Sequence, residues 1–297
     1  MTLIAIWANK PEDPTSIMLA TDSRLSNSDQ HWDRGTKIFR LGLSHQYFAF
    51  CGTALPALCA IQQSAVLLAT SNVLSQAILS DSKDAILSYA TMVSKHLSIN
   101  MRSFPKAWGS DATVICCGYC SRQNRFEIYK IVLPIADPMP ELVPLLFEKC
   151  RFYAFGSGKH EFELQASNAK NSSDFYRAFL QVILEGKVSS VGGPPQIVSI
   201  GIKRSKLIGV NWNFPSGGGG TVSTVLGQEL NSKHSLDSVD FRDMNFIRDR
   251  YLNSAQISRS GRPLKATKKE NGITYLAVDN GKSAKRRRRT TGRKPST

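Results

Sequence analysis

Three residues near the start of the chain have side chains that could together carry out nucleophilic chemistry. Thr2 supplies a hydroxyl group, and it would also carry a free α-amino group if Met1 were removed. An α-amino group titrates near pH 7.7–8.0, so it can act as the base for the hydroxyl of its own residue. Asp22 and Lys37 supply a carboxylate and an ammonium group. A lysine charge beside the amine would lower the pKa of the amine, and a carboxylate would keep the lysine charged.

Strands must bring these residues together. The apolar run after Thr2 predicts a strand over residues 3–8, and Ser16-Ile17-Met18-Leu19-Ala20-Thr21 predicts a second strand. The segment between them, residues 9–14, is rich in turn formers, so we expect a hairpin that ends at Asp22. Further strands are expected at 35–41, which carries Lys37, and at 46–51, before a long helix over 55–79.

The order of these segments resembles the first third of proteasome β-type subunits and of their bacterial relatives among the N-terminal nucleophile (Ntn) hydrolases. The resemblance depends on Thr2, the turn Thr21-Asp22-Ser23-Arg24, the Lys37 strand and the turn Cys51-Gly52-Thr53. It covers about residues 2–214 and is most specific in the first 60. It implies that Thr2 is the nucleophile, with Asp22 and Lys37 as its partners and no cofactor. It also implies that backbone N–H groups of Cys51 and Gly52 stabilise an oxyanion.

Later segments continue the resemblance, with two departures. Ala154-Phe155-Gly156-Ser157-Gly158 matches the family's Gly-Ser-Gly turn, which implies that Ser157 helps to hold the terminal amine; a plain small-residue turn is the alternative. Cys51 replaces the family's first glycine in its turn, and its side chain would narrow a substrate groove. The family also has an aspartate shortly before a glycine pair. Here Lys187-Val188-Ser189-Ser190 precedes Gly192-Gly193, so that aspartate is missing.

The fold class that the resemblance implies is α+β, as a four-layer αββα sandwich. Periodicity alone predicts only an α/β protein with helix pairs. Beyond the segments above, helices are expected at 82–99, 158–170 and 173–186. Further strands are expected at 112–118, 125–132, 151–155, 196–202 and 207–212.

Composition narrows the class of protein. The chain has 297 residues, of which 41% are hydrophobic, enough for one core with extensions. No apolar stretch reaches 18 residues and no secretory signal opens the chain, so we expect a cytoplasmic protein without a membrane partner. Cys116-Cys117-Gly118-Tyr119-Cys120 looks like half a zinc site, but no second half follows, so no metal site is predicted. Gly156-Ser157-Gly158-Lys159 lacks the spacing of a phosphate-binding loop.

The chain divides into three parts. Residues 1–215 form the expected Ntn-hydrolase domain, and residues 216–255 form a Gly-rich linker with a short helix around 238–252. Residues 256–297 form a basic tail, expected to be disordered, with 13 Lys or Arg against 2 Asp or Glu, a net charge of +11 out of +15. Within it, the run Lys285-Arg286-Arg287-Arg288-Arg289 could bind polyanions through charge alone or remain solvated.

Three hypotheses follow. The first is a threonine-type hydrolase, and within that class a peptidase, assembled in rings and served by an unfoldase partner as its relatives are. The second is a non-catalytic proteasome-like subunit that keeps the fold for assembly, which the missing aspartate and Cys51 favour. The third is a nucleic-acid-binding protein that acts through residues 285–289. Loss of Met1 separates the first hypothesis from the second, because only the first requires it.

Overall fold

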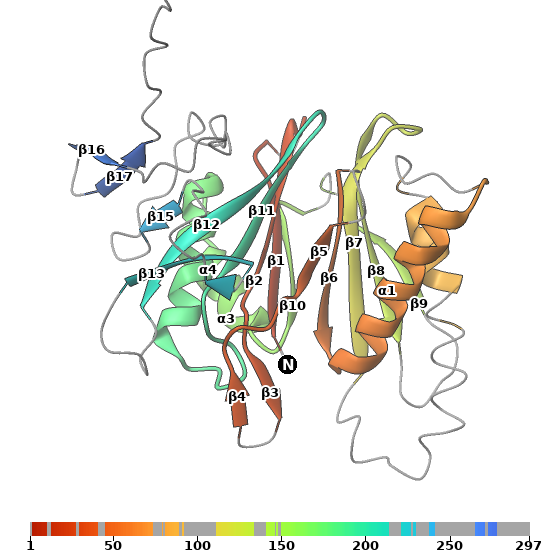
Figure 1. The fold of residues 1–297 in the computed structure, drawn as a ribbon, viewed down its shortest axis with the longest axis horizontal. Helices are drawn as coiled ribbons and strands as arrows, with labels where there is room; N and C mark the ends of the chain where they lie inside the picture. Colours follow the sequence, from red (N-terminus) through yellow and green to blue (C-terminus); the bar gives the residue numbers. More distant parts are fainter. Residues whose placement is uncertain are drawn as a thin grey trace, which may run out of the picture.

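The computed structural model has a mixed α+β fold with largely antiparallel sheets, and α+β is the fold class that the resemblance implies (Figure 1). It describes residues 2–10, 13–27, 30–40, 45–73, 79, 81–88, 91, 111–133, 141–145, 147, 150–213, 221–226, 228–229, 238–240, 265–270 and 273–277.

The larger sheet contains both strands of the expected N-terminal hairpin. Its order is β10-β1-β2-β11-β12-β13-β14, and β15 lies beside β12. The bounds are Leu3–Ala8 (β1), Ser16–Thr21 (β2), Phe152–Gly156 (β10), Gln196–Gly201 (β11), Ser205–Asn213 (β12), Thr221–Val225 (β13), Gln228–Glu229 (β14) and Ser238–Asp240 (β15). All pairs in it are antiparallel except β12 with β15. The central place of β1 and β2 buries the hairpin that carries Thr2 and Asp22.

The second sheet has the order β5-β6-β7-β8-β9 and is antiparallel throughout. Its bounds are Ile38–Arg40 (β5), Gln46–Gly52 (β6), Ala112–Cys120 (β7), Arg125–Leu133 (β8) and Glu141–Leu145 (β9). A small hairpin of β3 (Leu25–Asn27) and β4 (Gln30–Trp32) lies between β2 and β5 in the chain and was not expected from the sequence. It projects from the same end of the molecule as the start of β1 (Figure 1).

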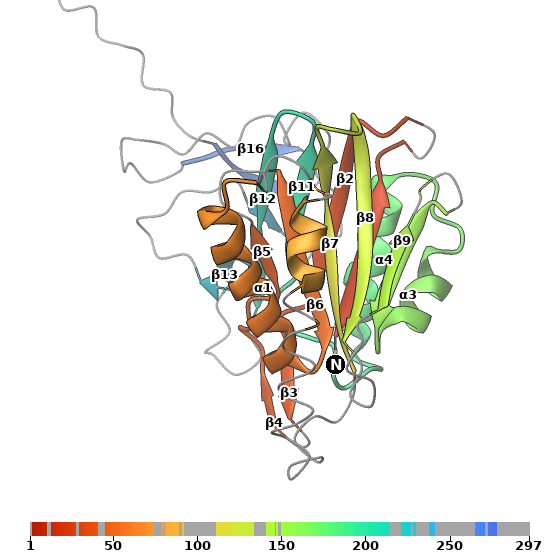
Figure 2. The same cartoon turned by 90° about the vertical axis from the view of Figure 1, so that its right-hand side faces the viewer.

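Helices cover the outer faces of the two sheets. Helices α3 (Lys159–Ala166) and α4 (Ser172–Glu185) lie against the larger sheet, and α1 (Ala54–Thr70) lies across the smaller one (Figures 1 and 2). Asn171 caps α4 by accepting a hydrogen bond from the backbone N–H of Asp174. The described part of the helix expected over 82–99, residues 81–88 and 91, is helical.

Three buried clusters hold these elements together. One lies between α3, α4 and the larger sheet, one lies between the two sheets, and one lies between α1 and the smaller sheet. Along β1, Leu3, Ala5 and Trp7 belong to the first cluster, whereas Ile4, Ile6 and Ala8 belong to the second. Because successive side chains point to opposite faces, a strand buried on both faces must be apolar throughout, as β1 is.

The helix expected over 55–79 is shorter in the structure. Helix α1 ends at Thr70, and Ser71 has extended backbone geometry. The Thr70 hydroxyl donates a hydrogen bond to the carbonyl of Val66, and the Ser71 hydroxyl accepts one from the N–H of Val73. Ser and Thr side chains compete in this way with helical backbone bonds, which explains why the helix stops although apolar residues follow.

The C-terminal part differs from expectation at three places. After the Gly-rich run, β13 pairs with β12, so the chain returns to the larger sheet. The short helix expected around 238–252 is wrong at its start, because Ser238–Asp240 is a strand paired with β12, and residues 241–252 lie outside the described residues. Within the expected disordered tail, Lys265–Glu270 (β16) and Ile273–Ala277 (β17) pair antiparallel. The basic run at 285–289 lies outside the described residues.

Candidate functional site

Antiparallel pairing of β1 and β2 brings Thr2 and Asp22 together. Ile4 lies opposite Thr21, so the residue before β1 meets the residue after β2 at one end of the hairpin. The backbone N–H of Asp22 donates to the carbonyl of Leu3 at 3.2 Å and fixes this register. The Thr2 hydroxyl donates to Oδ1 of Asp22 at 2.7 Å, and Thr2 is only 2% exposed.

The carboxylate of Asp22 is fully buried and has a donor at every side. Its Oδ1 accepts hydrogen bonds from the Thr2 hydroxyl, from the N–H of Leu3 at 2.9 Å and from Nζ of Lys37 at 2.9 Å. Its Oδ2 accepts from the N–H groups of Gly192 at 3.1 Å and Arg24 at 3.2 Å. Buried carboxylates are stable only when they are paired and hydrogen-bonded, and these five donors meet that need.

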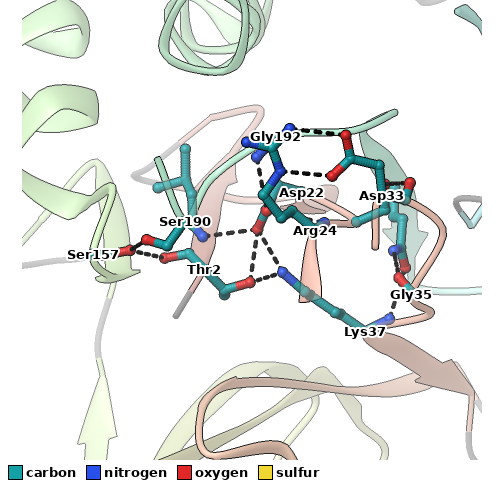
Figure 3. A network of polar contacts seen from close by, with 12 residues as sticks. Thr2, Asp22, Arg24, Asp33, Gly35, Lys37, Ser157, Ser190 and Gly192 are labelled. Atoms are coloured by element: carbon teal, nitrogen blue, oxygen red, sulfur yellow. Dashed lines mark hydrogen bonds and ion pairs between the residues drawn. The ribbon is translucent and has the colours of Figure 1, made fainter. Parts of the chain in front are cut away.

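Lys37 completes a triangle of polar groups (Figure 3). Its Nζ contacts both Oγ1 of Thr2 and Oδ1 of Asp22, and its side chain is 1% exposed. Burial lowers the pKa of Lys37 below the ordinary value, and the Asp22 carboxylate opposes that shift. The Lys37 ammonium group faces the oxygen of Thr2 directly.

Gln196 anchors the segment that carries Lys37. Its side-chain carbonyl accepts from the N–H of Lys37 at 2.9 Å and of Ile38 at 3.3 Å, while its Nε2 donates to the carbonyl of Gly35 at 2.5 Å. The sequence analysis missed Gln196, because one glutamine at the start of β11 shows nothing of its partners in sequence. Its effect is to hold Lys37 in front of Thr2 from the neighbouring sheet.

Ser157 lies beside Thr2, together with a serine that the sequence analysis did not single out. The Ser157 hydroxyl donates to the carbonyl of Thr2 at 3.4 Å and lies 2.7 Å from the hydroxyl of Ser190. The N–H of Gly158 donates to the same carbonyl at 3.4 Å. Ser157 thus contacts the backbone of Thr2, where the resemblance implies a contact with its amine. The only sequence signal for Ser190 was its place before the glycine pair.

Cys51 and Gly52 are the last two residues of β6, and Cys51 lies near the part of β10 that packs on the Thr2 backbone. A Cβ atom built on Gly156 would lie 2.0 Å from the Thr2 carbonyl oxygen and 3.4 Å from Cβ of Cys51. Burial raises the pKa of the Cys51 thiol to about 11, and the nearby Lys37 charge opposes this shift. The thiol is therefore neutral near pH 7, so Cys51 does not compete with Thr2 as a nucleophile.

In the segment 187–190, where the resemblance leads us to expect an aspartate, Lys187 and Ser189 are exposed and Ser190 is buried. Lys187 forms an ion pair with Glu185 at 2.9 Å, and both side chains are partly or largely exposed. The nearest part of this segment to Thr2 is Ser190, through Ser157. In place of the expected carboxylate, this segment contributes the Ser190 hydroxyl, which lies against Ser157, and a surface ion pair between Lys187 and Glu185.

The described cysteines are all free thiols. Cys116 belongs to the cluster under α1 and Cys117 to the cluster between the sheets, so the two side chains point to opposite faces of β7. Burial raises the pKa of both thiols, which disfavours the thiolate form that binds metal. In the described part of the chain, no three His, Cys, Asp or Glu side chains gather as a metal-ion site.

Comparison with known proteins adds no assignment: no family model and no curated protein matches the chain. Within the described residues, no helix combines the length and apolar character needed to cross a membrane.

Proposed function

We propose that the chain is a threonine-type N-terminal nucleophile hydrolase, and within that class a peptidase. The observation that carries this proposal is the position of the Thr2 hydroxyl, which donates to Asp22 and accepts from Lys37 in a buried site. A threonine is a weak nucleophile unless a base removes its proton and a positive charge stabilises the resulting oxygen. Lys37 supplies the charge. The base is the α-amino group of Thr2, once the peptide bond before Thr2 is opened.

The reaction then takes two steps. Oγ1 of Thr2 attacks the substrate carbonyl carbon while its proton passes to the α-amino group, and backbone N–H groups at Cys51 and Gly52 bind the oxyanion. When the tetrahedral intermediate collapses, the amine leaving group takes up that proton and an ester to Thr2 remains. Water attacks this ester with the α-amino group again as base, which releases the acid product and restores the Thr2 hydroxyl. Asp22 keeps Lys37 charged and oriented throughout.

The packing order supports the finer fold assignment. Helices α3 and α4, the larger sheet, the smaller sheet and α1 follow one another with a buried cluster at each junction. We therefore propose the four-layer αββα sandwich of the Ntn hydrolases for this chain. Assembly into rings and an unfoldase partner belong to the same proposal, because they come from the resemblance to proteasome β-type subunits. The cytoplasmic location expected from the sequence stays a prediction beside it.

A non-catalytic assembly subunit is the second candidate. Two observations favour it: Thr2 is almost completely buried, and Lys187 forms a surface ion pair where the family has an aspartate. Such a subunit would keep Asp22 and Lys37 as an internal ion pair and would not expose the amine of Thr2. Nucleic-acid binding, the third hypothesis, rests on residues 285–289 alone, outside the described residues.

Intact mass and a covalent probe test the proposal together. The active protein should show a free amine on Thr2, and a peptide epoxyketone, which needs both the hydroxyl and the amine, should add once per chain. Thr2→Ala should lose both labelling and the hydrolysis of short fluorogenic peptides. Thr70→Ala, at an exposed hydroxyl on α1, is the matched control and should keep both. Labelling or hydrolysis by Thr2→Ala at the parent rate would refute the proposal.

A further inference from the structure

All three guanidinium nitrogen atoms of Arg24 donate hydrogen bonds close to the site, although none of these bonds reaches Thr2 or Lys37. Its Nε and Nη2 donate to the two carboxylate oxygens of Asp33 at 2.6 and 2.8 Å, in a bidentate pair. Its Nη1 donates to the carbonyl of Ser189 at 2.9 Å. Asp33 follows β4 directly. One side chain therefore ties the base of the β3–β4 hairpin to the turn over residues 189–193.

The turn over residues 189–193 is hydrogen-bonded to Asp22 directly and is linked to Thr2 through Ser157. The N–H of Gly192 donates to Oδ2 of Asp22, and the carbonyl of Gly192 accepts from the N–H groups of Ser23 at 3.2 Å and Arg24 at 3.0 Å. Ser190 contacts Ser157, which donates to the Thr2 carbonyl. A shift of this turn would thus reach Asp22 through one contact and Thr2 through two (Figure 3).

The glycine pair in the turn is explained by the approach of Arg24 and its neighbours. A Cβ atom on Gly192 would lie 2.5 Å from Cζ of Arg24, so the guanidinium group packs directly on the backbone. A Cβ atom on Gly193 would lie 2.6 Å from the hydroxyl of Ser23 and 2.7 Å from the carbonyl oxygen of Asp33. A larger residue at Gly192 would displace the guanidinium group of Arg24, and one at Gly193 would push the turn away from the backbone of Asp33.

We propose that Arg24 is a positioning residue, which acts through the turn over residues 189–193 to hold Asp22 and Ser190 in register with Thr2. This inference rests on the proposed function. The Arg24–Asp33 pair itself should contribute little to stability, because both side chains are partly exposed to solvent, at 23% and 26%. Catalytic geometry is far more sensitive, since a displacement of about 1 Å can cost about 10²-fold in rate.

Because the pair adds little stability but catalytic geometry is sensitive to small displacements, Arg24→Gln should affect activity much more than folding. The unfolding midpoint should change little, kcat should fall by about 10- to 100-fold, and KM should stay within about threefold of the parent value. Arg24→Lys should restore little, because an ammonium group cannot make the bidentate contact and reach Ser189 as well. Arg177→Gln, on the outer face of α4, is the control and should leave kcat unchanged.

Amide hydrogen exchange at Gly192 gives a readout that does not depend on activity. Loss of Arg24 should speed exchange of this amide by about tenfold or more, since the turn loses its anchor, whereas Arg177→Gln should leave it unchanged. Unchanged exchange at Gly192 in Arg24→Gln would overturn the inference, as would a kcat within about twofold of the parent. A parent protein that neither turns over peptides nor takes up the probe would instead refute the proposed function. In that case fast exchange in Arg24→Gln would show a structural clamp without a catalytic role.

Discussion

Gly156→Ala tests whether the backbone of Thr2 is held as closely as the structure indicates. Gly156 lies opposite Leu3 in the β1–β10 pair and has φ of +86°, a conformation that side chains disfavour. A Cβ atom there would lie 2.0 Å from the Thr2 carbonyl oxygen. Contacts shorter than 3.0 Å are essentially never seen for a real Cβ, so the two groups must separate by at least 1.0 Å, which is 3.0 minus 2.0.

That separation should affect stability and activity to different degrees. The positive φ alone costs about 1 kcal/mol for alanine. Moving the Thr2 carbonyl also removes its contacts with Ser157 and Gly158, and a clash in a buried strand brings the total to about 2–4 kcal/mol. A displacement of this size at the nucleophile should lower the rate of hydrolysis by about 10²-fold in the molecules that remain folded.

Gly186→Ala is the matched control. Gly186 ends α4 with φ of +62°, and a Cβ atom there would meet no atom within 4 Å. Its substitution therefore measures the conformational cost alone, about 1 kcal/mol, and should leave activity unchanged. Urea unfolding and peptide hydrolysis would be measured for both variants. Equal losses of stability in the two variants, with full activity in Gly156→Ala, would refute the close packing of Gly156 on Thr2.

Three further predictions address Lys37, Cys51 and the tail. Lys37→Ala should lower hydrolysis by about 10²–10⁴-fold and Lys37→Arg should rescue poorly; a loss of less than about threefold would make Lys37 a structural ion-pair partner. Because burial lowers the pKa of Lys37, the alkaline limb of activity should lie below pH 10.5. The Cys51 thiol has its pKa raised from 9.0 to about 11, so its contribution to stability is complete below pH 9 and is lost as pH rises to 11. Urea unfolding should therefore show the parent losing about 2 kcal/mol more than Cys51→Ala between pH 9 and pH 11, and parallel curves would contradict this. Deleting residues 278–297 should abolish binding to single-stranded nucleic acid, which in the parent should weaken with salt at a slope of about −3.5 for five contacts; equal binding by both proteins would place the contact in the core.

The meeting of Thr2 and Asp22 could be anticipated from local patterns, whereas the place of Lys37 beside them was expected only from the resemblance to proteasome β-type subunits. Two apolar runs joined by a turn-rich segment predict a hairpin, and a hairpin brings the residues at its open end together. Lys37 was expected on a strand and lies just before β5, yet it still faces Thr2. The structure describes where these side chains lie, and their catalytic role remains a prediction.

The contacts that the sequence did not predict are made by segments far apart in the chain. Gln196 holds residues 35–38, and Arg24 joins Asp33 to Ser189, so each contact depends on tertiary packing. The β3–β4 hairpin is too polar to show the alternation of a half-buried strand. The β16–β17 pair did carry a local signal, because Asn271-Gly272 separates the two strands and is a strong hairpin sequence. Our prediction of a disordered tail followed the basic composition of residues 256–297 and gave no weight to this turn.

The buried ion pair itself indicates function more than stability. Lys37 and Asp22 are almost completely removed from water, and the loss of hydration on burying two charges can exceed the attraction between them. An apolar pair of similar volume would often be as stable or more so, so packing alone does not explain a lysine at this position. The only described groups that its ammonium contacts are the Asp22 carboxylate and the Thr2 hydroxyl. The contact between this ammonium group and the Thr2 oxygen is the one that the proposed threonine nucleophile would use, and packing alone gives no reason for it.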